Sequence, residues 1–193
     1  ALRESIRGLE LFLSVARETN AEEFRRFAHP LIDASTVEIL SYLPRVDRSE
    51  REQFEAALEE AGFPAGFIFQ INASGDKQPA DEAEFHYPVL HTEPLDPHRY
   101  AIGFDAFSDE QRRKAMISAA LTGFPAAPPP LPLVMKDSDE NSIIVYSPVF
   151  GTAEHTAEAQ PEGYVVALIR AQPLLEQIVA RHTLQNQCTS MEL

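Results

Sequence analysis

The acid at Asp105 is the first feature of this chain that points to chemistry. It lies within the apolar stretch Tyr100–Phe107, whose composition predicts a strand. Side chains alternate between the two faces of a strand, so Asp105 shares its face with the small residues Ala101 and Gly103. That face therefore has room for another group beside the carboxylate.

Two kinds of partner for this carboxylate are consistent with the sequence. A buried carboxylate without a partner is costly, so one of them must be present unless Asp105 is exposed. The first is a small molecule with N–H donors, held at about 1.5–3 kcal/mol per charged hydrogen bond. The second is a salt bridge to a base of the next predicted helix, which offers Arg112, Arg113 and Lys114.

No other set of residues forms a recognisable catalytic, cofactor or metal site. The sequence has no phosphate-binding loop, no dinucleotide-type glycine fingerprint, no nucleophile elbow and no zinc-protease motif. His86 and His91 face opposite ways on a predicted strand, and His91 with Glu93 supplies only two ligands on one face. We therefore expect no catalytic residue, no metal and no cofactor.

The composition restricts the class of protein. The 193 residues include 30 acidic and 16 basic side chains, a net charge of −14, so we expect no nucleic-acid partner. A hydrophobic fraction of 44% predicts a packed core. The single cysteine, Cys188, excludes an internal disulfide, and the chain has no apolar run long enough to span a membrane.

The N-terminal segment 1–35 is predicted to be helical. Its first helix carries a seam of apolar residues with heptad spacing, namely Leu2, Ile6, Leu9, Leu13 and Ala16. This seam fits two arrangements, either a long stalk helix that pairs with a second copy of the chain or a helix packed on its own domain. We expect a long N-terminal helix through which the chain forms a homodimer.

The remaining chain divides into two parts. Segment 36–170 contains short apolar stretches at hairpin spacing together with capped helices, which predicts an antiparallel sheet with flanking helices and an α+β fold. Segment 171–193 is predicted to be a C-terminal helix.

Several short motifs occur in a characteristic order along this chain. They are Tyr42-Leu43-Pro44-Arg45-Val46, Glu50-Arg51, Phe54-Glu55, Tyr87-Pro88-Val89, Gly103-Phe104-Asp105, Ser108-Asp109, Arg112-Arg113, Thr122-Gly123 and Tyr146-Ser147-Pro148-Val149. In this order and spacing, the chain resembles the CHASE domain over roughly residues 24–169. This is the extracytoplasmic sensor module of plant cytokinin-receptor histidine kinases and of many bacterial signalling receptors.

The resemblance implies a fold, a location and a site. It implies a long helix leading into a PAS-like sheet that binds a small molecule, possibly purine-like, in the periplasmic or extracytoplasmic part of an inner-membrane or plasma-membrane receptor. The output would be a histidine kinase or a cyclic-dinucleotide enzyme. Asp105 would bind the ligand ring. The apolar pocket residues, placed by strand position, would be Val89, Phe104, Leu133, Val145 and Tyr164.

Two departures from the family pattern modify these expectations. The stalk of the plant receptors has a cysteine pair, and this chain has none. The membrane-proximal part that should follow the C-terminal helix is expected to be missing or reduced. A ligand-free dimerisation or spacer module is the alternative function that the sequence leaves open.

Overall fold

A computed structural model describes residues 2–15, 19–33, 35–129, 142–151 and 160–170. Its helices are α1 (Leu2–Val15), α2 (Ala21–Asp33), α3 (Arg51–Glu60), α4 (Leu95–His98) and α5 (Glu110–Thr122), with short 3-10 turns η1 (Arg99–Ala101) and η2 (Ala106–Ser108). Its strands are β1 (Val37–Pro44), β2 (Val46–Asp47), β3 (Phe69–Ile71), β4 (Lys77–Pro79), β5 (Phe85–His86), β6 (His91–Glu93), β7 (Ser142–Val149) and β8 (Gly163–Arg170). The fold is α+β, as the sequence predicted.

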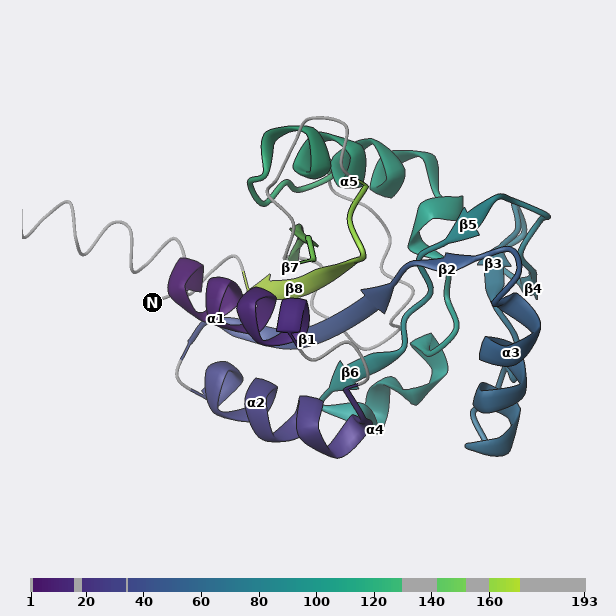
Figure 1. Cartoon of the computed structure of the whole chain (residues 1–193), viewed down its shortest axis with the longest axis horizontal. Helices are drawn as coiled ribbons and strands as arrows, with labels where there is room; N and C mark the ends of the chain where they lie inside the picture. Colours follow the sequence, from purple (N-terminus) through teal and green to yellow (C-terminus); the bar gives the residue numbers. More distant parts are fainter. Residues whose placement is uncertain (1, 16–18, 34, 130–141, 152–159, 171–193) are drawn as a thin grey trace, which may run out of the picture.

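The centre of the molecule is a four-stranded antiparallel sheet in the order β6-β1-β8-β7 (Figure 1). Its long strands are rich in valine and isoleucine, which fit a pleated, half-buried surface. The register pairs Ser41 with Val166 and Val166 with Tyr146, so these three side chains point to one face. The sheet thus presents a separate set of side chains to each of its two faces.

The first face is covered by α1 and α2. Helix α1 packs on β7 and β8, and α2 packs on β1 and β6. The seam residues of α1 that the structure describes, Ile6, Leu9 and Leu13, are buried in this core together with Leu40 and Val165. Burial of such side chains stabilises the domain by roughly 1.5–3 kcal/mol each.

The second face is covered by α5 and by the segment from Tyr87 to Phe107. Helix α5 begins at a cap in which the Asp109 side chain accepts a hydrogen bond from the Arg112 amide, and it ends at Gly123 in the left-handed conformation. Met116 and Ala119 of α5 are buried in the same core as Tyr146 and Tyr164. This face carries the pocket described below.

A smaller unit formed by α3, β2, β3, β4 and β5 extends from one end of the sheet (right in Figure 1). Hydrogen bonds of Arg51 in α3 hold this unit together. Its Nε donates to the Glu55 carboxylate at 2.9 Å, and its Nη2 donates to the Ala80 carbonyl at 3.0 Å. Glu55 in turn accepts from the Ile68 amide at 3.1 Å. These contacts hold α3 against β3 and β4.

One expectation from the sequence is not confirmed and another needs correction. The structure describes 14 residues of α1, so a long N-terminal helix is not confirmed, and the seam residues Ile6, Leu9 and Leu13 are buried inside the domain. Tyr100–Phe107 is not a strand, because η1 and η2 interrupt it and leave only isolated bridges at Phe104 and Asp105. The PAS-like topology and the boundaries at 35 and 170 stay predictions, and the predicted C-terminal helix lies outside the described residues.

Candidate ligand-binding pocket and the Asp105 network

A pocket opens between the second face of the sheet and α5. The space in it that a water-sized molecule can reach is about 60 Å³, inside a larger hollow that is partly open to solvent. The residues that line it are Ile39, Ser41, Leu43, Val89, Ala101, Phe104, Ala106, Arg112, Ile144, Tyr146, Val166 and Leu168. These walls are almost entirely apolar.

The few polar groups of the pocket come from three elements. Arg112 belongs to the first turn of α5, is only 5% exposed, and places its guanidinium carbon 5.4 Å from the centroid of the Phe104 ring. Ser41 of β1 donates a hydrogen bond to the Thr92 hydroxyl of β6 at 3.1 Å. Tyr146 contributes a phenol from β7. An apolar pocket with a few convergent polar groups is the usual form of a small-molecule site.

The Tyr146 hydroxyl stays protonated at neutral pH. Burial raises the pKa of Tyr146 to about 12, the positive charge of Arg112 opposes this rise, and the carboxylate of Asp109 adds to it. Tyr146 is therefore a neutral hydrogen-bond donor.

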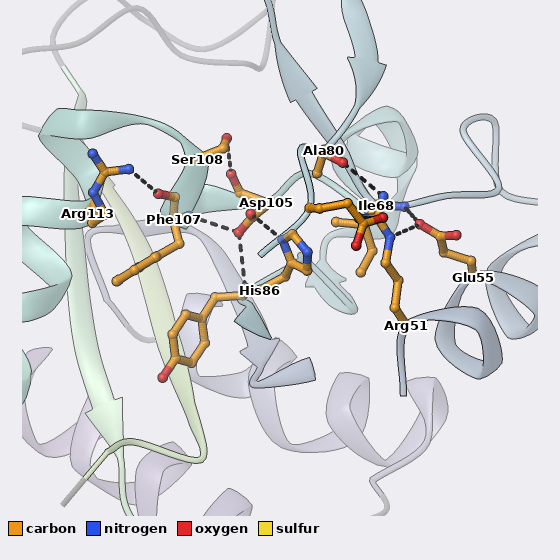
Figure 2. A network of polar contacts seen from close by, with 11 residues as sticks. Arg51, Glu55, Ile68, Ala80, His86, Asp105, Phe107, Ser108 and Arg113 are labelled. Atoms are coloured by element: carbon orange, nitrogen blue, oxygen red, sulfur yellow. Dashed lines mark hydrogen bonds and ion pairs between the residues drawn. The ribbon is translucent and has the colours of Figure 1, made fainter. Parts of the chain in front are cut away.

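Asp105 is buried beside the pocket and is fully engaged with the protein. Its Oδ1 accepts from the backbone amides of Tyr87 and Phe107, both at 3.0 Å, and its Oδ2 lies 2.9 Å from Nδ1 of His86. Figure 2 shows these contacts converging on the carboxylate. An ionised carboxylate only accepts hydrogen bonds, so His86 donates its Nδ1–H to it.

The local backbone explains why Asp105 takes this position. Asp105 is the N-cap of η2, and its carbonyl also accepts from the Ser108 hydroxyl at 2.6 Å. Arg113 donates to the Phe107 carbonyl at 3.0 Å, which ties the same turn to α5 (Figure 2). The Asp105 network thereby fixes a turn whose neighbouring side chains, Phe104 and Ala106, line the pocket.

The structure distributes the predicted site residues over several places. Val89 and Phe104 line the pocket, whereas Asp105 is beside it and not in its lining. Val145 packs with the core of the opposite sheet face. Tyr164 is buried under α5, where its hydroxyl donates to the Met116 carbonyl at 3.0 Å. Leu133 lies outside the described residues.

The salt bridge to a base of α5 was one of two alternatives that the sequence left open. Asp105 pairs with His86 of β5, whereas Arg113 donates to the Phe107 carbonyl and Lys114 pairs with Glu110 at 2.7 Å. Sequence reasoning did not place Arg112 in a pocket. The signal that could have found it is the helical position of Arg112 four residues before Met116, which places both side chains on the buried face of α5.

Within the described ranges, no group of three or more His, Cys, Asp and Glu side chains could hold a metal ion. None of the helices in that part of the chain is long and apolar enough to cross a membrane.

Comparison with known families now assigns the class of protein. The family model of the CHASE domain matches residues 17–193, and the chain therefore belongs to the CHASE domain family. CHASE domains are extracytoplasmic sensor domains of membrane signalling receptors and are not catalytic. No curated protein matches the chain.

Proposed function

We propose that this chain is the part of a transmembrane receptor that binds a small molecule outside the cytoplasm, and that the pocket between the sheet and α5 is its ligand site. The observation that carries the proposal is the pocket itself, a largely apolar space with a few polar groups in a domain of a sensor family. The parent receptor would carry a histidine kinase or a cyclic-dinucleotide enzyme as its output.

The strands offer a route from the pocket to the N-terminal helix. Neighbouring residues of β7 face opposite ways, with Tyr146 in the pocket and Ser147 on the side of α1. The Ser147 hydroxyl donates to the Glu10 carboxylate of α1. A ligand that prefers one spacing of α5 and the sheet would therefore bias the position of α1. Homodimerisation of the receptor would use surfaces other than the buried seam.

In this proposal, Asp105 supports the pocket through the turn that it holds. The resemblance to plant receptors assigns it direct contact with a purine-like ligand. Both oxygens already accept hydrogen bonds from the protein, so such a contact would use only the remaining acceptor capacity of the carboxylate. If Asp105 supports the turn, an Asp105 variant lowers the stability of the domain. If Asp105 contacts only the ligand, the variant lowers the affinity for the ligand.

A thermal-shift screen of the whole chain tests the proposal. The compounds are adenine derivatives, other small heterocycles, and short organic acids with their amides. A compound at about a hundred times its Kd should stabilise the chain by about 2.7 kcal/mol. Ala106→Leu places extra carbons in the pocket and should abolish the shift, whereas Ala56→Leu on the exposed side of α3 should preserve it.

The alternative is a ligand-free spacer. The observation that favours it is that both oxygens of the Asp105 carboxylate already accept hydrogen bonds from the protein, so the carboxylate needs no ligand to be stable. If no compound shifts the midpoint of the wild-type chain, the spacer function replaces the sensor function.

A further inference from the structure

The sheet side of the pocket is apolar because side chains alternate along its strands. Every second residue of β1 points into the pocket, namely Ile39, Ser41 and Leu43, and β7 and β8 each contribute two more. Ser41 is the polar member of the β1 set, and its hydroxyl already donates to the Thr92 hydroxyl at 3.1 Å. The sheet therefore presents mainly carbon to a ligand.

The opposite wall has one charged side chain among the described residues, and the protein itself engages it. Arg112 has a partner within the protein, and its guanidinium carbon lies 5.4 Å from the centroid of the Phe104 ring. Its charge is therefore not left over for a ligand. Almost all of the wall surface that a ligand could touch is carbon.

Two alanines leave a small space in the wall opposite the sheet. Ala101 and Ala106 line the pocket there, and both are buried. The space that a water-sized molecule can reach is about 60 Å³, and about 10–15 Å³ is the least that holds one water. The space thus has room for about four to six water-sized groups, and a methylene is similar in size to a water molecule. A purine is larger, and its polar nitrogens would meet few partners in this lining.

We propose that the ligand is a small, neutral and mainly hydrocarbon molecule of about four to six carbons, such as a short aliphatic alcohol or ketone. Its carbon chain lies between Leu43 and Val166 of the sheet and the two alanines of the opposite wall. This inference rests on the proposed sensor function of the same pocket and names the class of ligand that the pocket takes. Apolar cavities bind hydrocarbons, whereas an ion would lose its hydration there without gaining a partner.

A homologous series of alcohols measures the hydrocarbon contribution. Propan-1-ol to decan-1-ol are titrated into the whole 193-residue chain labelled with 15N, and the amide shifts of β1, β7 and β8 report binding in the pocket. Each added methylene should tighten binding about fourfold, because it buries a further apolar group. The gain should end at about five or six carbons, where the pocket is full. An affinity that does not depend on length overturns the apolar site, and a gain that continues to decan-1-ol overturns the small ligand.

Five-carbon compounds with different head groups test the neutral class. Pentan-1-ol and pentan-2-one should bind within about threefold of each other, whereas pentanoate and pentylammonium should bind at least about tenfold more weakly. An ion of either sign that binds as tightly as the alcohol overturns the neutral ligand.

Two substitutions assign the binding to this pocket. Ala106→Val adds carbons to the lining and should shorten the longest alcohol that still gains affinity, whereas Val166→Ala removes carbons and should lengthen it. Ala56→Leu adds carbons on the exposed side of α3 and should leave the series unchanged. A purely structural role of these side chains would change stability and not the length limit. A limit that stays the same in both folded variants overturns the assignment to this pocket.

The outcomes separate this inference from the function on which it rests. If adenine derivatives, other heterocycles or organic acids bind while the alcohols and the ketone do not, the apolar ligand is overturned and the sensor function stands. If no compound of any class binds the wild-type chain, the sensor function itself fails and the apolar ligand fails with it. The wild-type length series and head-group comparison decide the question even if a variant does not fold.

Discussion

Asp105 and His86 form a buried pair in which Oδ2 of the acid lies 2.9 Å from Nδ1 of the imidazole, with side chains 6% and 2% exposed. The pair joins β5 to the turn that precedes α5. Nε2 of the same imidazole is buried and has no hydrogen-bond partner in the described part of the chain. In that part of the chain, the hydrogen bonding of the His86 ring therefore depends on Asp105.

Asp105→Ala should destabilise the domain by about 2 kcal/mol or more, since it removes the acceptor of three hydrogen-bond donors. These donors are the backbone amides of Tyr87 and Phe107 and the His86 imidazole. Urea unfolding measures the loss, and Asp76→Ala, at an exposed turn, is the matched control. If Asp105 contacted only the ligand, the Asp105 variant would be about as stable as the control and would no longer bind the ligand.

Gly103→Ala should destabilise the domain by more than Gly75→Ala does. Both glycines have a positive φ, 89° and 86°, so both variants incur backbone strain of about 1–2 kcal/mol. A Cβ at Gly103 would also lie 2.6 Å from the Phe67 carbonyl oxygen, whereas one at Gly75 meets no atom within 4 Å. The difference between the two unfolding free energies measures this clash, and equal losses would show that the Gly103 turn relaxes.

The sequence was informative where local signals agree with the tertiary structure. Heptad spacing located α1, and the helix predicted to carry Arg112, Arg113 and Lys114 is α5. Short apolar stretches at hairpin spacing predicted the antiparallel sheet that contains β1, β7 and β8. In each of these elements, propensity, periodicity and end signals favour the same conformation.

The site was harder to predict because it depends on contacts between distant residues. Asp105 pairs with His86, 19 positions away, and no helical or strand period relates the two. Gly103 has a positive φ and lies so close to the Phe67 carbonyl that a Cβ would clash with it, and the apolar stretch around it forms two 3-10 turns instead of a strand. Val145 was assigned to the pocket, and the strand register directs it to the other face of the sheet.

Leu9→Ala should destabilise the chain by about 2–5 kcal/mol, because Leu9 is fully buried between α1 and the sheet. Leu11 lies on the same helix with 56% of its surface exposed, so Leu11→Ala should change stability by no more than about 0.5 kcal/mol. Urea unfolding at two protein concentrations checks both values. If the loss for Leu9→Ala depends on protein concentration, the seam belongs to an interface between copies and not to the core of one domain.

His91 connects stability to pH. Its ring is buried against Phe24, with centroids 5.4 Å apart, and its Nε2 lies 2.7 Å from the Thr19 carbonyl oxygen. Burial lowers the pKa of His91, and the hydrogen bond to Thr19 partly opposes this. The folded chain thus holds His91 neutral at pH values where the unfolded chain, with an imidazole pKa of about 6.5, binds a proton.

Stability should therefore fall as the pH drops below about 6.5, toward the lowered pKa of His91 in the folded chain. The unfolded state binds more protons in this window, so His91 contributes a slope of at most about 1.4 kcal/mol per pH unit. His91→Gln should remove this contribution and make the curve shallower, while its neutral amide can still donate to the Thr19 carbonyl. Urea unfolding between pH 7.5 and 5, together with the NMR shift of the His91 ring protons, measures both effects. Parallel curves for the wild type and His91→Gln would assign the acid sensitivity to other groups.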